Sequence, residues 1–483
     1  MPTRGSKDPN GRALRGRRAH TTFALLTDPA RQIWNSFNNR ANAGGANAPE
    51  AAVNGCLYDR FKSLYNKTAT KPSLVIVPAR FKSGTLYSQI PSSNADFTVT
   101  RPLNTATRFD SSALIQTGIT SGVPRLDYYT SGGVTGCPAL LVEPAATNLH
   151  TQSEAFASNY TQVINLSASG TNLTAPDNSA TADRYFETTA NGVHIITIPA
   201  GGGFALTSGT VYTFSTFAQS VGGRNFRLAL TAGGSIDVLY TLSGSGTVSN
   251  TSVATIQNFG NGWYRCTYTF TATSSVNFRQ NIYSVSGTTN SFVGDVTKGF
   301  IVWGAQLETG SVATSYIPTT AGTGSRSADV VSVSGAVSGS IGQTEGVVYA
   351  QVDLRNWTAS GRVLAISNGT SDARVMIQVG ANRTLQAVVT AASGEVANIA
   401  TASGQVNGIY KCAVAYASGD FAFYVNGNQI GTDSSGAVPA CNNVALGKIE
   451  TSASTNFLND RILAGALYNT RLLNADLATL TTP

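Results

Sequence analysis

The sequence predicts a mainly β protein, with two β-sandwich (jelly-roll) domains in tandem and a short α-helical N-terminal anchor. Charged residues make up only 12% of the chain, against about 25% in typical soluble proteins. The hydrophobic fraction of 42% is still large enough to build cores. Tyr, Phe, Val, Ile and Leu recur at strand spacing between polar turns, which favours many short strands over a helical bundle with Lys- and Glu-rich faces.

The N-terminal segment 1–70 carries all of the net charge. It contains 11 Lys and Arg against 4 Asp and Glu, whereas the remaining chain contains 21 of each. Residues 1–20 hold most of these cations and have no hydrophobic face. A basic arm of this kind indicates contact with an acidic partner, either nucleic acid or an acidic protein surface. A solvated tail without a partner is the alternative.

Two helices are predicted after this arm. Asp28 and Pro29 form a helix start, with Asp28 as N-cap, and a second helix follows within residues 49–67. A hairpin of this size cannot bury much surface alone and needs a neighbour, either in its own oligomer or in a docking partner. We therefore interpret residues 1–70 as an anchoring module, with a simple capping domain as the alternative. The residues expected to make the contact are Arg4, Arg12, Arg15, Arg17, Arg18, Trp34 and Phe37.

Residues 71–150 are predicted to form an extended, partly irregular β connector. Asp110, Asp127 and Glu143 stand near Arg or Pro residues in this segment. Because an unpaired buried charge is costly, we expect these carboxylates to form ion pairs that lock the connector. A metal or catalytic cluster is the less favoured reading.

Residues 151–325 are predicted to form the first sandwich. The run from Tyr212 to Ala218 alternates with period two apart from a one-residue slip, which is typical of a β-bulge. Jelly rolls of this kind can stack sugars on exposed aromatic rings. Most aromatic residues here occupy inward strand positions, however, and we expect them to form the core.

Residues 326–483 are predicted to form the second sandwich. Its clearest hairpin spans Tyr410–Gly427, in which Asn426 and Gly427 supply a type I′ turn. The chain closes with a last strand and a short helical turn. The strands NGWYRCTYTF (261–270) and NGIYKCAVAY (407–416) align without gaps, each with a basic residue next to a cysteine.

The cysteines and the hydropathy indicate in which cellular compartment the protein assembles and whether it enters a membrane. Five cysteines are present, none in a CxxC pair, and Cys266 and Cys412 lie in predicted strands as buried free thiols. This suits assembly in a reducing cytoplasm. No signal-peptide pattern and no run of about 18 apolar residues is present, so no membrane insertion is expected.

No arrangement for catalysis is evident in the sequence. Hydrolytic sandwiches need two carboxylates that face one cleft, and no E-x-D-x-x-E spacing occurs in the last domain. Asp420 and Asp433 flank a hairpin and could hold Ca²⁺, although surface-turn roles are favoured. We expect no enzyme activity, no cofactor and no metal site.

Two motif series resemble those of tailed-phage virion fibres (head or tail fibres). They are WGAQLE-G-ATSYIPT-R-AD across 303–329 and ATRFD-LI-PRLDY-LLVEP-TNL-SE-F across 106–156. In that family the first series joins a carbohydrate-binding-like jelly roll to a concanavalin/laminin-G-like domain.

The resemblance implies a non-enzymatic, homo-oligomeric, commonly trimeric virion protein, assembled in the host cytoplasm. Its N-terminus would dock on capsid or tail proteins, and it would attach weakly to host-surface glycans. The alternative is a tail receptor-binding fibre that recognises a host polysaccharide. A bacterial surface lectin is a weaker third reading.

Overall fold

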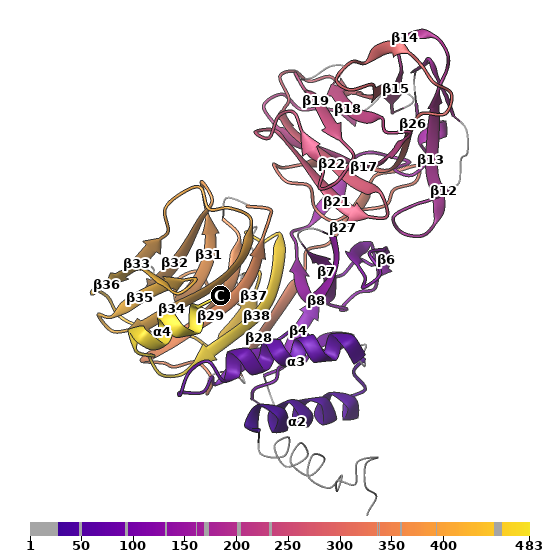
Figure 1. The fold of residues 1–483 in the computed structure, drawn as a ribbon. Coiled ribbons are helices and arrows are strands. Elements are labelled where there is room, and N and C mark those ends of the chain that lie inside the picture. The colour runs from indigo at the N-terminus through magenta and orange to yellow at the C-terminus, as the bar shows by residue number, and fades with distance from the viewer. Residues whose placement is uncertain are drawn as a thin grey trace, which may run out of the picture.

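The protein is mainly β, with two sandwiches and three short α-helices among the residues that the structure describes (Figure 1). The structure is a computed structural model. It describes residues 28–47, 51–91, 95–130, 133–160, 162–168, 173–199, 204–230, 234–335, 337, 339–357, 360–392, 394–448 and 456–483. The predicted fold class is confirmed.

The large sandwich packs a sheet of eight strands against a sheet of nine. The eight-stranded sheet runs β36 (Asn428–Asp433), β35 (Phe421–Val425), β34 (Gly408–Ala417), β29 (Glu345–Leu354), β38 (Asp460–Tyr468), β8 (Gly133–Val142) and β7 (Arg125–Thr130), with β1 (Leu74–Ile76) also on β38. The nine-stranded sheet runs β2 (Phe81–Lys82), β3 (Thr85–Leu86), β4 (Phe97–Thr100), β28 (Val330–Ser334), β37 (Asn443–Leu446), β30 (Arg362–Ser367), β31 (Arg374–Gly380), β32 (Thr384–Ala391) and β33 (Gly394–Ala400).

Six strands of residues 71–150 (β1 to β4, β7 and β8) belong to the large sandwich, so the prediction of a connector is wrong for these parts. β4 pairs with β28, and β1 and β8 both pair with β38. The large sandwich is therefore discontinuous in sequence, and residues 151–325 form an insertion within it. The ends of the insertion meet where β9 (Ala146–Asn148) pairs with β27 (Gly324–Arg326). A separate two-stranded sheet, β5 (Ala106–Phe109) with β6 (Ile115–Ile119), lies beside them.

The eight-stranded sheet is buried on both faces. Along β29, Val348 and Ala350 face the core between the two sheets, whereas Val347 and Tyr349 face the helices. This follows from the period-two alternation of a strand. It also explains why β29 reads as a nearly continuous apolar run rather than an alternating one.

The helices α2 (Pro29–Ala43), α3 (Ala51–Tyr65) and α4 (Asn474–Thr481) cover the outer face of this sheet. Figure 1 shows α2 and α3 stacked at the base of the large sandwich. Trp34 and Phe37 are each only 1% exposed, and they pack in the cluster that includes Tyr349 and Ala466. The prediction that these two side chains contact a docking partner is therefore wrong, because the neighbour that the hairpin needs is the large sandwich of the same chain.

A disulfide joins the hairpin to the sandwich. Cys56 on α3 is bonded to Cys137 on β8, 81 residues later in the chain. Sequence spacing did not reveal this pair, because the two elements meet only in the tertiary fold. Cys266 and Cys412 are buried free thiols as predicted, and Cys441 is also buried and free. None of the described helices has both the length and the apolar character needed to cross a membrane.

The predicted N-cap of α2 is confirmed, and we expect it to stabilise the hairpin. The Asp28 carboxylate accepts a hydrogen bond from Ala30 N at 3.1 Å and one from the Tyr58 hydroxyl at 3.0 Å. Asp28→Ala should lower the free energy of unfolding by about 1–2 kcal/mol, because helix N–H groups lose their acceptor. Urea denaturation measures this. Asp59→Ala, an exposed acidic residue on α3, is the control and should change stability by less than about 0.5 kcal/mol. Equal effects of the two variants would contradict the capping role.

The inserted sandwich packs a sheet of six strands against a sheet of seven. The first runs β10 (Gln162–Ile164), β15 (Ile195–Ile198), β24 (Gln280–Val285), β18 (Asn225–Leu230), β19 (Asp237–Thr241) and β20 (Thr247–Val248). The second runs β11 (Leu166–Ala168), β13 (Ala180–Glu187), β26 (Gly299–Thr309), β17 (Val211–Val221), β22 (Trp263–Thr271) and β21 (Ala254–Gly260), with β12 (Leu173–Thr174) also on β13. Short pairs β14 (Asn191–Val193) with β25 (Ser291–Val293) and β16 (Phe204–Ala205) with β23 (Asn277–Phe278) lie outside these two sheets.

The aromatic residues of the inserted sandwich mostly form its core, as predicted. Tyr185, Phe214, Tyr240 and Tyr268 are fully buried in one cluster. The slip predicted in β17 is also present, as a register shift between Ser215 and Phe217 against β26.

We expect the buried His150 to make the stability of the protein depend on pH. Its ring is fully buried near Phe204 and Phe214, Nδ1 donates to Thr151 O at 2.8 Å, and Nε2 has no partner. Burial lowers the pKa of His150 from 6.5 to about 4. The folded state therefore resists protonation, and stability present above pH 6.5 is lost as the pH falls from 6.5 to about 4.

The loss from His150 alone should reach at most about 3 kcal/mol. His150→Leu should flatten the urea stability profile between pH 6.5 and 4 relative to the parent protein. If the stability profiles of His150→Leu and the parent protein remain parallel across this pH range, His150 does not cause the pH dependence of stability.

The turns at the end of the chain agree with the sequence. Asn426 and Gly427 have φ of +49° and +83°, as a type I′ turn between β35 and β36 requires. The predicted closing helix is α4.

Candidate functional site

Five buried charged residues lie where the two sandwiches join. Arg125 donates to Glu143 at 2.6 Å and also pairs with Asp329. Arg101 pairs with Asp329 at 2.9 Å, and Arg326 lies 3.2 Å from Glu143. The five side chains are between 0% and 4% exposed. We call these residues the junction network.

The carboxylates of the junction network are fully engaged, whereas Arg101 Nε and Arg326 Nε have no partner among the described residues. Burial alone would raise the pKa of Glu143, but the guanidiniums of Arg326 and Arg125 outweigh it and hold that pKa well below its ordinary value. Glu143 also accepts hydrogen bonds from Ser315 N and Oγ, both at 2.7 Å. A carboxylate held this way is ionised and fully engaged, so it stabilises the junction rather than transferring protons.

The ion pairs predicted for residues 71–150 are partly confirmed. Glu143 is paired in the junction network, and Asp127 pairs with Arg461 at 2.8 Å. Asp110 has no ion pair in the part of the chain that the structure describes. Its carboxylate instead accepts hydrogen bonds from Ser112 N and Leu114 N and closes a turn.

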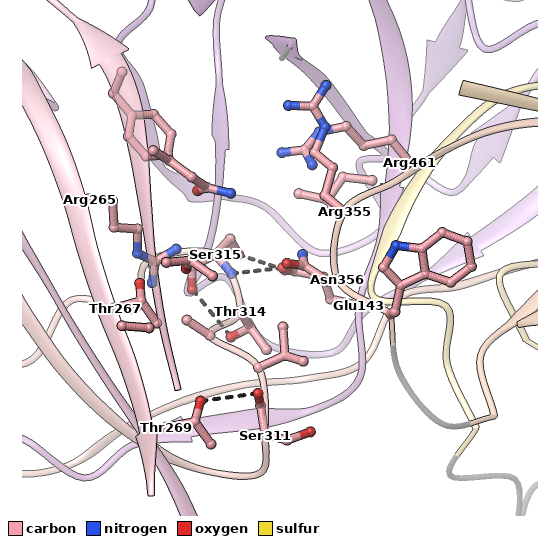
Figure 2. A pocket seen from close by; sticks show the side chains of 18 of the residues that line it. Glu143, Arg265, Thr267, Thr269, Ser311, Thr314, Ser315, Arg355, Asn356 and Arg461 are labelled. Atoms are coloured by element: carbon pink, nitrogen blue, oxygen red, sulfur yellow. Dashed lines mark hydrogen bonds between the residues drawn. The ribbon is translucent and has the colours of Figure 1, made fainter. Parts of the chain in front are cut away.

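A cleft of about 380 Å³ lies beside the junction network, between the inserted and large sandwiches (Figure 2). Three parts of the chain line it: the outer face of β21 and β22, the loop that follows β26, and the loops and strand ends of the large sandwich. In Figure 2 Arg265, Thr267 and Thr269 lie on one side, with Arg355 and Arg461 on the other.

Strand alternation builds the wall from the inserted sandwich. On β22, Tyr264, Cys266 and Tyr268 point into the core. Arg265, Thr267 and Thr269 therefore point outward into the cleft, where all three are lining residues. On β21, Gln257 is the cross-strand partner of Arg265, and Thr255 is the partner of Thr267. This wall consequently presents hydroxyl, amide and guanidinium groups.

The opposite wall begins directly after β29. The Asp460 carboxylate accepts hydrogen bonds from Arg355 N at 2.9 Å and Asn356 N at 2.8 Å, which fixes this loop. Trp357 follows, partly exposed, with its indole Nε1 donating to Asn407 Oδ1 at 2.9 Å and its ring edge-on to Tyr410. An indole held in this way offers a fixed apolar surface at the cleft.

Arg265 is the buried cation of the cleft with the least compensation of its charge. It is 8% exposed, and Nη2 donates to Ser215 Oγ at 2.9 Å, whereas Nε has no partner. Among the described residues no carboxylate lies within ion-pair distance of it. Burial lowers the pKa of Arg265, and the Glu308 and Glu143 carboxyls partly oppose this. Ser215 reaches Arg265 from β17, beside the bulge described above.

Of the predicted site residues, Trp34 and Phe37 lie under the helical hairpin and not in this cleft. Arg4, Arg12, Arg15, Arg17 and Arg18 are outside the described residues. Asp433 accepts hydrogen bonds from Ser435, and Asp420 pairs with Arg471, so both have the surface-turn roles that were favoured. In the described ranges no group of three or more His, Cys, Asp or Glu side chains is placed to hold a metal ion.

The cleft itself was not predicted. The one available signal was Arg265, a charged residue at an outward position of a strand whose other residues are uncharged. The opposite wall comes from segments 90 or more residues away in the chain (Arg355 is the nearest), and the sequence alone does not bring the two walls together.

Comparisons with known proteins give only weak structural likenesses, each over about a third of the chain or less. No protein-family model matches the chain, and no curated protein matches it. Among solved structures, the CBM40 module of the Ruminococcus gnavus IT-sialidase is similar over 29% of this chain and 84% of that one, with 16% identity and a TM-score of 0.27. A SAP-like pentraxin from Limulus polyphemus is similar over 28% and 68%, with 14% identity and a TM-score of 0.23.

The NanB sialidase of Streptococcus pneumoniae is similar over 31% of this chain and 26% of its own length, with 10% identity and a TM-score of 0.28. At identities and TM-scores this low, none of these likenesses assigns a ligand or an activity to this chain.

Proposed function

We propose that this chain is a non-enzymatic binding protein that holds a saccharide in the cleft between its two sandwiches. The observation that carries the proposal is the lining of the cleft. Hydroxyl, amide and guanidinium groups converge there beside Trp357, a partly exposed indole. Sugars present hydroxyl groups around an apolar ring face, and such a lining can satisfy both.

The size and stiffness of the cleft suit this role. Its volume of about 380 Å³ falls in the usual range of roughly 300–1,000 Å³ for small-molecule sites. The junction network and the hydrogen bonds of Asp460 hold its walls in place. A preformed site loses less conformational entropy when a ligand binds.

The carboxylates of the cleft favour binding over hydrolysis. Asp127 is paired with Arg461, and Glu143 is paired with Arg125 and Arg326. A general acid needs a carboxyl that holds a proton near neutral pH, and Arg326 and Arg125 lower the pKa of Glu143. Incubation with the bound oligosaccharide, followed by mass spectrometry, should recover it intact.

Trp357→Ala should weaken saccharide binding about tenfold, because the apolar sugar face loses its stacking surface. An array of bacterial surface glycans identifies the ligand, and isothermal titration calorimetry measures the affinity. Tyr283→Ala, a partly exposed aromatic residue on β24 outside the cleft, is the matched control. Unchanged affinity in Trp357→Ala would place the sugar elsewhere, and no binding to any glycan would contradict the proposed function.

We further propose that the protein is a fibre or decoration component of a phage virion, homo-oligomeric and usually trimeric, and anchored to the capsid or tail. Support comes from the motif series at 106–156 and 303–329 and from the basic arm.

The test of the anchor removes only residues 1–27, because α2 packs on the large sandwich and its loss would disturb the fold. That deletion should abolish incorporation into particles and leave saccharide binding unchanged, whereas normal incorporation would contradict the anchor. If the alternative of a tail receptor-binding fibre holds, Trp357→Ala will also reduce host adsorption.

A further inference from the structure

The cationic side chains of the cleft differ in how far they are neutralised. Four arginines and two carboxylates line it. Arg355 is paired with Asp353 at 2.6 Å, and Arg461 is paired with Asp127 at 2.8 Å. Arg265 in the wall and the exposed Arg383 at the rim have no ion pair among the residues described. The junction network behind the cleft holds three arginines against two carboxylates.

Arg265 has hydrogen-bonding capacity that the protein does not use. A guanidinium carries five N–H donors, and within the described part of the chain Arg265 makes a side-chain hydrogen bond only to Ser215 Oγ. The ring of Phe217 lies 5.5 Å from Cζ and compensates the charge on one face only. A buried cation without a counter-charge is costly, and this cost falls when an anion binds.

The nearby carboxyls do not supply that anion. Glu143 is occupied by Arg125, Arg326 and Ser315. Glu308 accepts hydrogen bonds from Gln306 Nε2 at 2.6 Å and Thr314 Oγ1 at 2.5 Å. Burial raises the pKa of Glu308, and no ion pair joins its carboxyl to Arg265 among the described residues.

Neutral polar side chains of β21 and β22 lie next to Arg265 on the same wall of the cleft. Gln257 is its cross-strand partner, and Thr255 and Thr267 form the adjacent cross-strand pair. The amide and the two hydroxyl groups have no side-chain hydrogen bond within the described part of the chain. An acidic group at Arg265 would therefore leave neighbouring sugar hydroxyls within reach of neutral donors and acceptors.

We infer that the cleft selects an acidic saccharide, carrying a carboxylate or a sulfate ester, and that Arg265 receives the anionic group. This inference rests on the proposed saccharide-binding function. Arg265 is the contact residue, Ser215 orients its guanidinium, and Gln257 and Thr267 bind the sugar that carries the acid. Arg383 at the rim adds a longer-range attraction for the same charge.

Matched sugar pairs test this selection. Oligosaccharides that contain glucuronic acid are compared with those that contain glucose at the same position, and 6-sulfated galactose is compared with galactose. The full chain should bind at least one acidic member about 10- to 100-fold more tightly than its neutral counterpart, as expected for a charge-assisted hydrogen bond. The two pairs distinguish a carboxylate ligand from a sulfate ligand. The preference for the acidic sugar over the neutral one should weaken as the salt concentration is raised, because salt screens the attraction between the two charges.

Substitutions in the β22 wall of the cleft test whether Arg265 contacts the acidic group of the sugar. Arg265→Gln should remove the preference, because it weakens binding of the acidic sugar far more than binding of its neutral counterpart. Ser215→Ala keeps the charge but releases the guanidinium, and should weaken acidic binding several-fold. Arg279→Gln, an exposed arginine between β23 and β24 outside the cleft, should have no effect. Thermal unfolding confirms that each variant is folded.

The outcomes separate the two proposals. Neutral sugars bound as tightly as their acidic counterparts would overturn the inference and leave saccharide binding intact. Preference retained in folded Arg265→Gln would also overturn it. Absence of binding to either member of every pair, and to the glycan array, would contradict the proposed function itself. If Arg265→Gln does not fold, Ser215→Ala with unchanged preference decides against the inference.

Discussion

A fragment of residues 326–483 expressed alone is expected not to fold. Within the intact chain β28 pairs with β4 on one sheet, and β38 pairs with β1 and β8 on the other. Removing residues 28–150 deletes these partners and exposes the face of β29 and β34 that the helices cover. The fragment would keep unpaired strand edges and an apolar surface, both of which favour aggregation. Circular dichroism during heating should show no cooperative transition.

Two further fragments provide the controls. Residues 151–325 contain the complete core of the inserted sandwich, and should unfold cooperatively on their own. Residues 28–150 joined to 324–483 by a short Gly-Ser linker should also fold, because Asn148 and Gly324 are paired neighbours. A cooperative, soluble 326–483 fragment would contradict the discontinuous large sandwich.

Arg125→Ala should lower the free energy of unfolding by about 3–5 kcal/mol, the range for breaking a buried ion pair. The substitution leaves Glu143 and Asp329 without their shared guanidinium, and Thr107 O also loses a donor at 3.1 Å. Burying two carboxylates with reduced compensation is costly. Urea denaturation monitored by tryptophan fluorescence measures the change.

Asp237→Ala is the matched control for this prediction. Asp237 is 63% exposed and lies 3.5 Å from Arg227, so its removal should change stability by less than about 1 kcal/mol. If Arg125→Ala shifts the urea midpoint no more than Asp237→Ala does, the junction network does not stabilise the two sandwiches.

Local sequence patterns predicted the local structure well. Asp28 before Pro29 fixed the start of α2, and Asn426-Gly427 identified a turn, because each signal lies within a few residues. The aromatic residues of the inserted sandwich were likewise predicted to form its core, and most of them do. The slip in β17 was readable because it interrupts a strict period of two.

Long-range pairing could not be predicted. The strands at 71–150 have ordinary patterns, and nothing local indicates that β8 joins β38 more than 300 residues later. The helix around Trp34 correctly called for a neighbour, but amphipathicity does not say which surface covers it. The cleft was missed for the same reason, because Arg265 and Trp357 meet only after the inserted sandwich docks on the large one.

Hydrogen exchange of the full chain, with and without a saturating oligosaccharide, tests most directly whether the ligand occupies the junction of the two sandwiches. Binding there should slow exchange together in β21 and β22, in residues 311–315 and in residues 355–357, which all line the cleft. Protection confined to one sandwich, such as the outer strands β31–β33, would contradict the account.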